Sequence, residues 1–167
     1  MIIRIVGALF LSLIGAFAGI AHSEKLKCRM DTCLEIEMMM RDAEIIIRCT
    51  GCDVYRLIST LKSKSGRKTA FLAGMSDTYS ENSNFRAEWQ NAVENDTALS
   101  AEEKGVLRDF GIQLGTTDIQ GQVSNIEFLI CRIHSLYEER AAEYARKGKL
   151  YRSLGVLAGA ALGIIII

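Results

Sequence analysis

Hydrophobic residues recur at helical spacing along the first part of the chain. Between Glu24 and Arg48, apolar residues return every four or seven positions, with charged residues between them. That spacing places the apolar side chains on one face of a helix. The sequence therefore predicts a long amphipathic helix over residues 24–48, and its expected buried face comprises Leu26, Met30, Leu34, Met38 and Ile45.

Shorter helices are expected after a break at Thr50 and Gly51. The apolar positions within 54–61 predict one helix, the polar residues of 62–68 a loop, and residues 69–75 another short helix. Residues 80–84 are polar and typical of a turn, and the apolar spacing from Phe85 to Val93 predicts a further helix.

Capping signals mark the start of the next two helices. Ser100 with Glu103 forms a capping box, in which hydroxyl and carboxylate satisfy free backbone amides, so a helix is expected over 101–114. Gly115 is expected to end that helix. Thr117 with Gln120 predicts a second capping box at the start of the longest helix.

This longest helix carries a heptad seam of apolar residues. The seam residues follow one another at spacings of four, three, four, three, four and seven: Ile119, Val123, Ile126, Ile130, Ile133, Tyr137 and Tyr144. Such a seam favours antiparallel pairing with the long first helix, which places both ends of the intervening domain at one membrane surface. The alternative is an ordinary bundle core in which the seam has no partner role.

The two ends of the chain are uncharged over long stretches. Residues 5–21 and 153–167 contain no Asp, Glu, Lys or Arg, which predicts transmembrane segments at 1–21 and 151–167 around a helical-bundle domain of residues 22–150. Because both segments have basic flanks facing the domain, we expect that domain to be cytoplasmic. The alternative is an exported helical protein with a cleaved signal peptide and a C-terminal membrane anchor.

Small residues repeat every fourth position in both end segments. Gly15 and Gly19 do so in the first segment, and Gly155, Gly159 and Gly163 in the last. Because glycines at this spacing let helices approach closely, we expect them to form membrane-helix packing faces. The alternative is that glycine is simply commoner in membrane helices than in soluble ones.

Composition supports an all-α fold without indicating a charged partner. The chain lacks proline and is 49% hydrophobic, which favours long uninterrupted helices in a bundle. Lys plus Arg and Asp plus Glu both number 20, so no bulk charge attracts nucleic acid or acidic lipid. Five cysteines are an odd number, which favours reduced thiols in the cytoplasm over a disulfide framework.

The motifs that carry chemistry are weak. Cys49 and Cys52 form a single C-x-x-C, and no second pair completes a zinc site, so two small buried thiols at a turn are the simpler interpretation. His22 and His134 lack a nucleophile motif, the phosphate-binding glycine loop is missing from the sequence, and carboxylates such as Glu103 are expected on solvated helix faces. We therefore expect no enzyme activity, no cofactor and no catalytic or metal-binding residue.

Two segments resemble a known family. Residues 114–122, Leu-Gly-Thr-Thr-Asp-Ile-Gln-Gly-Gln, and 149–155, Lys-Leu-Tyr-Arg-Ser-Leu-Gly, look like the stage III sporulation protein AB family. The resemblance covers about residues 85–167, and upstream it is one of layout, with cysteines at a turn where such proteins commonly have proline. The family-motif residues that it makes candidates for interaction are Leu114, Gly115, Asp118, Gln122, Tyr151 and Arg152.

The resemblance implies a structural role. Members of that family belong to a channel or secretion-like assembly, made in the mother cell of endospore-forming bacteria, that joins mother cell and forespore. Their soluble domain is similar to the cytoplasmic domains of type II secretion platform proteins. By analogy we expect a two-pass protein of the mother-cell membrane around the forespore. Its expected partners are a cytosolic secretion-type ATPase, other membrane proteins of the complex and the lipid bilayer.

Overall fold

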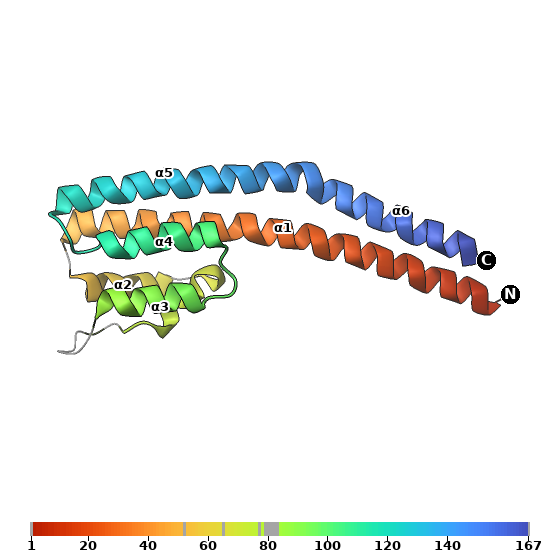
Figure 1. Cartoon of the computed structure of the whole chain (residues 1–167), viewed down its shortest axis with the longest axis horizontal. Coiled ribbons are helices and arrows are strands. Elements are labelled where there is room, and N and C mark those ends of the chain that lie inside the picture. The colour runs from red at the N-terminus through yellow and green to blue at the C-terminus, as the bar shows by residue number, and fades with distance from the viewer. Residues whose placement is uncertain (1, 52, 65, 77, 79–83, 167) are drawn as a thin grey trace. The chain divides into compact units, whose positions relative to one another are not determined.

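The computed structural model describes residues 2–51, 53–64, 66–76, 78 and 84–166. The side chains of 2–9, 11–12, 67–68, 152, 159–160 and 162–166 lie outside this description. Within the described ranges the chain forms helices and connecting turns, with no strand, as Figure 1 shows. The prediction of an all-α fold is therefore confirmed.

Six α-helices, one 3-10 segment and one π-helical segment make up the described structure. In chain order they are α1 (Ile2–Thr50), α2 (Val54–Lys64), the 3-10 segment η1 (Arg67–Gly74), α3 (Phe85–Asn95), α4 (Ala101–Gln113), α5 (Ile119–Glu143), the π-helical segment η2 (Tyr144–Gly148) and α6 (Lys149–Ile166). The short helix predicted over 69–75 is thus a 3-10 segment, and η2 interrupts what the sequence predicted as one long helix.

The chain divides into two compact units. Unit 1 comprises residues 1–30 and 138–167, and unit 2 comprises residues 31–137. Unit 2 contains the second part of α1, all of α2, η1, α3 and α4, and most of α5. Within it α3 contacts α4 and η1, and α2 contacts η1.

The core of unit 2 is built around Trp89 on α3. This indole is 1% exposed and lies 5.4 Å from the ring of Phe71 and 5.4 Å from that of Phe110, measured between centroids. Its Nε1 donates a 2.7 Å hydrogen bond to the Leu107 carbonyl, which satisfies the one polar atom of the ring. Gly111 of α4 faces the indole, where a Cβ atom would lie 2.6 Å from Trp89 Cγ. A helical residue with no side chain is therefore what lets α4 approach the tryptophan.

The predicted buried face of the first helix is wrong within unit 2. Leu34, Met38 and Ile45 are exposed, whereas a different set packs in the core: Cys33, Ile36, Met40, Ala43 and Ile47. The segment 36–47 contains runs of consecutive apolar residues, so more than one helical face fits the apolar spacing. We call Leu34, Met38 and Ile45 the α1 stripe.

The predicted apolar seam of α5 is confirmed at most of its positions within unit 2. Val123, Ile126, Ile130 and Ile133 are all buried, as the heptad spacing predicted, and Leu129 joins them. Ile119, the first seam residue, is 48% exposed. Within unit 2, the hydrogen bond between Glu37 and His134 and the ion pair between Arg48 and Glu127 show that α5 runs antiparallel to α1.

In unit 1 the first part of α1 also lies against the last helices. Gly19 and Gly155 meet at their backbones, and a Cβ atom on Gly155 would lie 2.5 Å from the Gly15 carbonyl oxygen. Further along, the rings of His22 and Tyr151 are 4.1 Å apart between centroids. The segments that meet are far apart in sequence and run antiparallel (Figure 1).

A helix that spans a membrane requires a long stretch of predominantly apolar residues. Among the described residues, no helix combines the length and the apolar character needed to cross a bilayer. The transmembrane segments expected at 1–21 and 151–167 are not supported by that finding.

Candidate interaction site

The turn between α4 and α5 contains four of the family-motif residues. Leu114 is the buried C-cap of α4, and its amide donates to the Phe110 carbonyl. Gly115 follows with φ of +70°, a left-handed conformation that glycine adopts without the steric cost of a Cβ atom. The glycine thus ends α4 as the sequence predicted.

Asp118 and Gln122 then hold the turn to the start of α5. The Asp118 Oδ1 accepts hydrogen bonds from the Gly121 amide and the Thr117 hydroxyl, both at 3.1 Å. The Gln122 side chain accepts from the Gly115 amide at 3.1 Å and donates to the Thr117 carbonyl at 2.8 Å. The expected box of Thr117 with Gln120 is therefore wrong, because Asp118 is the capping residue and Gln122 reaches back in place of Gln120.

Two glycine turns pack at this end of unit 2. Gly51, with φ of +54°, lies against the Ile119 side chain, and Gly115 lies against that of Val54. In each case an added Cβ atom would lie 3.1 Å from its neighbour's methyl carbon. The α1–α2 connection and the α4–α5 turn are therefore held against each other's helices at close range.

A surface groove of about 820 Å³ opens beside the turn. Its lining comes from α1, from the turn and from the first two turns of α5: Arg48, Asp118, Ile119, Gln120, Val123, Ser124 and Glu127. We call these residues the end groove. Half-exposed Ile119 and exposed Gln120 offer an apolar and a polar contact side by side.

Arg48 is the charged residue that joins the two walls of the end groove. Its guanidinium lies 2.7 Å from Glu44 on α1 and 2.8 Å from Glu127 on α5. The Arg48 and Glu127 side chains are exposed to water and that of Glu44 is partly exposed. These ion pairs therefore fix local geometry more than they stabilise the fold. The groove therefore combines Arg48, the carboxylates of Asp118 and Glu127, and an accessible isoleucine. Of these, arginine is a residue type that is enriched at protein interfaces.

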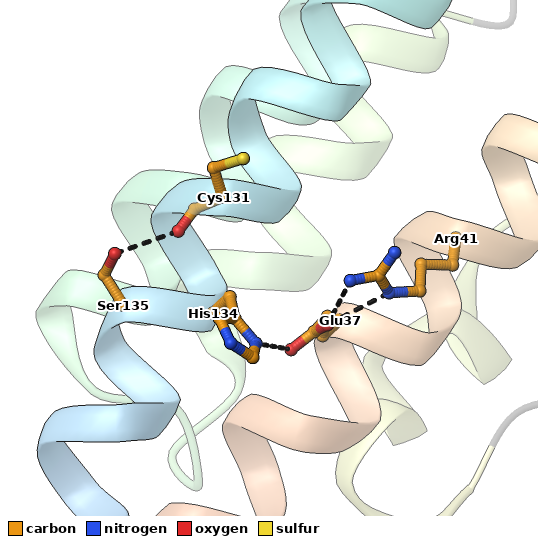
Figure 2. A network of polar contacts seen from close by, with 5 residues as sticks. All are labelled: Glu37, Arg41, Cys131, His134 and Ser135. Carbon is orange, nitrogen blue, oxygen red and sulfur yellow. Dashed lines mark hydrogen bonds and ion pairs between the residues drawn. The ribbon is translucent and has the colours of Figure 1, made fainter.

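A polar network crosses the middle of the α1–α5 pair, as Figure 2 shows. The Glu37 carboxylate is 8% exposed and accepts from Arg41 Nε at 3.0 Å and Nη2 at 2.7 Å, and it lies 2.9 Å from His134 Nδ1. Burial raises the pKa of Glu37, but hydrogen bonds and positive charge from His134 and Arg41 together hold that pKa below its ordinary value. A buried carboxylate thus stays ionised because its own helix, α1, and the neighbouring α5 both supply donors.

The sequence did not indicate the network around Glu37, nor the one around Glu103. His134, which lacked any partner by sequence, lies against a carboxylate 97 residues earlier in the chain. Glu103 was expected on a solvated face, yet it is 2% exposed; its Oε2 accepts from the Ser100 amide and its Oε1 from the Cys33 thiol at 3.3 Å. The capping box at Ser100 is confirmed, and the burial of its carboxylate comes from α1 packing over it, which local sequence does not reveal.

The remaining predicted site residues lie in unit 1. Tyr151, Gly15, Gly19 and Gly155 meet along the antiparallel contact of α1 with α6, where a Cβ atom on Gly19 would lie 2.5 Å from the Tyr151 carbonyl oxygen. The side chain of Arg152 and the packing of Gly159 and Gly163 fall outside the described residues. The structure thus brings four of the eleven candidates together in unit 1 and four, Leu114, Gly115, Asp118 and Gln122, in the α4–α5 turn.

Metal sites in proteins require clustered thiol, imidazole or carboxylate side chains. Cys28, Cys49 and Cys131 are exposed thiols and Cys33 is a buried one, while Cys52 lies outside the described residues. Across the described part of the chain, no three His, Cys, Asp or Glu side chains are grouped so that they could hold a metal ion.

Comparison with known proteins identifies one match. A family model described as stage III sporulation protein AB matches residues 4–167, which is nearly the whole chain. No curated protein and no solved structure matched.

Proposed function

The chain belongs to the stage III sporulation protein AB family, and from that premise we propose that it is a non-catalytic structural component of a sporulation membrane assembly. In this proposal unit 1 attaches the protein to the membrane and unit 2 docks a cytosolic secretion-type ATPase through the end groove. Other membrane proteins of the same mother-cell to forespore channel complete the assembly.

The end groove supports the docking proposal because three residues of the family-motif segment 114–122 line it: Asp118, Ile119 and Gln120. Four backbone and side-chain hydrogen bonds hold residues 115–122 in one conformation, so the exposed side chains of Ile119 and Gln120 are presented on a fixed frame. A preorganised surface binds a partner without first losing conformational freedom. The single observation that carries the proposal is that part of the family-motif segment 114–122 lines an open groove.

Membrane attachment is supported by the surface of unit 1. Large apolar side chains are exposed on both of its segments: Phe10, Leu13, Ile14, Phe17, Ile20, Leu150, Leu154, Val156 and Leu157. Exposed apolar surface on this scale is unfavourable in water and favourable against lipid. We propose that unit 1 lies in the mother-cell membrane around the forespore and that unit 2 faces the cytoplasm.

Site-specific photo-cross-linking in sporulating cells tests the docking proposal. A benzophenone amino acid at Gln120 is expected to cross-link to the ATPase, whereas the same amino acid at Asn91 on α3, also exposed, is not. A third position, Met38, probes the α1 stripe. Cross-linking from Met38 or Asn91 but not from Gln120 would reject the end groove as the docking surface.

Labelling of the native cysteines tests the topology. Cys28, Cys49 and Cys131 are exposed on the protein surface, so a maleimide that enters their compartment can react with them. If that compartment is the cytoplasm, a membrane-impermeant maleimide should react only after protoplasts are lysed. Buried Cys33 should react only after denaturation, which provides an internal control for burial. Reaction in intact protoplasts would place the thiols outside the cytoplasm, and ATPase docking would then be impossible.

A further inference from the structure

The net charge of zero conceals a separation of charge between the two units. Unit 1 contains nine Lys and Arg residues but only four Asp and Glu residues, a net charge of +5. Unit 2 contains eleven Lys and Arg residues and sixteen Asp and Glu residues, a net charge of −5. The sequence-based expectation that charge indicates no partner therefore does not hold for unit 1 taken by itself.

Most of the positive charge of unit 1 lies in two short segments. Residues 22–29 and 144–152 together contain seven Lys and Arg residues and a single acidic residue, Glu24. Six of the seven have described side chains, and all six are exposed: Lys25, Lys27, Arg29, Arg146, Lys147 and Lys149. We call these six residues the basic belt.

Antiparallel pairing within unit 1 brings the two segments side by side. His22 stacks near Tyr151, and a Cβ atom on Gly148 would lie 3.3 Å from the Ser23 hydroxyl oxygen. The hydrogen bond from Lys147, together with the charges of Lys147, Arg29 and Arg140, holds the pKa of Glu143 below its ordinary value despite partial burial. Arg29 of α1 therefore lies close enough to the end of α5 to affect its carboxylate.

The basic belt directly adjoins the apolar surface of unit 1. In α1 the exposed apolar residues end at Ile20, one turn before Lys25, and in α6 Leu154 lies one turn after Lys149. A boundary between apolar surface and clustered cations matches the boundary between acyl chains and phosphate groups in a bilayer. Lys25, Lys27 and Lys149 form no ion pair within the described structure, so phosphate oxygens are available counterions for them.

We infer that the basic belt binds the headgroups of anionic phospholipids, so that the protein is preferentially surrounded by phosphatidylglycerol-type lipids. This inference rests on the proposed membrane attachment of unit 1 and adds the lipid class. Each Lys or Arg near an anionic surface strengthens association by about fivefold at moderate salt.

Electron paramagnetic resonance of spin-labelled lipids measures this preference on the full chain. The protein is reconstituted in phosphatidylcholine vesicles containing trace spin-labelled phosphatidylglycerol or phosphatidylcholine, and the motionally restricted fraction gives the relative association constant. We expect phosphatidylglycerol to associate about fivefold more strongly, with the preference falling at high salt because exposed charges are screened. In the triple variant Lys25→Gln, Lys27→Gln and Lys149→Gln, which retains the other three cations of the basic belt, the ratio should fall clearly below that of the native chain.

A matched variant controls for the loss of charge. Arg56→Gln, Lys64→Gln and Arg86→Gln removes three exposed cations from unit 2 and should leave the lipid preference unchanged. The fluorescence of Trp89, the one tryptophan, should be the same in both variants and the native chain, which verifies that unit 2 stays folded.

The possible outcomes separate this inference from the proposal beneath it. A chain that does not enter the vesicles overturns membrane attachment and the lipid preference together. A chain that enters but shows equal association of both lipids overturns only the lipid preference. Equal association, combined with cross-linking between copies that the triple variant abolishes, would identify the occupant of the basic belt as the acidic unit 2 of a second copy.

Discussion

Two glycines of α4 should respond in opposite directions to the same substitution. Gly105→Ala and Gly111→Ala each place a methyl group inside one helix, and each gains about 1 kcal/mol from the higher helix propensity of alanine. At Gly105 the nearest side-chain atom to the new Cβ would be Arg132 Nη2, at 3.8 Å, an ordinary contact. We therefore expect Gly105→Ala to raise the free energy of unfolding by about 0.5–1 kcal/mol.

At Gly111 the new methyl group meets the indole of Trp89. The Cβ atom would lie 2.6 Å from Trp89 Cγ and closer still to Cδ1 and Nε1. The indole cannot move aside, since Phe71, Phe85 and Phe110 surround it and its Nε1 is bonded to Leu107. Overpacking typically costs about 1–3 kcal/mol, and losing the Nε1 hydrogen bond adds about 1 kcal/mol. The net effect should be a destabilisation of about 2 kcal/mol.

Fluorescence of Trp89 reports this unfolding because it is the one tryptophan and lies in the core of unit 2. With about 4–8 °C of melting temperature per kcal/mol for a unit of this size, the two variants should differ by more than 10 °C. The native protein should melt between them. If Gly111→Ala is as stable as Gly105→Ala, the described contact between α4 and Trp89 is incorrect.

Further substitutions test the networks and turns, each by the same fluorescence unless stated. Glu37→Gln removes an ionised, mostly buried acceptor and should cost about 1–3 kcal/mol, whereas Glu127→Gln, whose ion pair is exposed, should cost less than about 0.5 kcal/mol; equal costs would contradict the role of Glu37. Because the pKa of Glu37 is lowered by folding, its contribution is present above the unfolded pKa of about 4.3 and is lost as pH falls through the folded pKa, so the acid limb of native stability should flatten in Glu37→Gln. Gly115→Ala should cost about 1 kcal/mol because its φ is +70° and its Cβ atom would press on Val54, and no loss would show that the turn readily relaxes. Gly155→Val should speed hydrogen exchange in residues 15–26 while Ala158→Val, at an exposed position of α6, should not; equal exchange in both would argue against close packing of α1 with α6.

Local signals in the sequence were sufficient for the helices and for both ends of α4, but not for the residues that cap the start of α5. Ser100 with Glu103 and the glycine at 115 mark ends of α4 because capping depends on residues three or four apart. The seam of α5 was predicted from spacing alone, since Val123, Ile126, Ile130 and Ile133 recur at alternating intervals of three and four residues. The all-α fold followed from these features.

Long-range contacts were beyond local reasoning. The buried face of α1 was misassigned because residues 36–47 are apolar on several faces, and only packing against α4 and α5 selects Ile36, Met40 and Ala43. His134 with Glu37 and Cys33 with Glu103 each join residues at least 70 positions apart. The end groove likewise depends on α1 reaching the start of α5, so of its residues only Asp118 could be named as a candidate from the sequence, and the wall formed by Arg48 could not.

Binding of the purified full chain to the ATPase tests the central claim most directly. Ile119 in the end groove and Ile112 on α4 are 48% and 49% exposed, so Ile119→Asp and Ile112→Asp add the same charge at equally accessible positions on different surfaces. If the end groove docks the ATPase, Ile119→Asp should weaken the affinity at least about tenfold, the loss of about 1.4 kcal/mol expected at an interface centre, while Ile112→Asp binds as the native chain does. Equal affinities for native chain and Ile119→Asp, or a loss confined to Ile112→Asp, would contradict docking at the end groove.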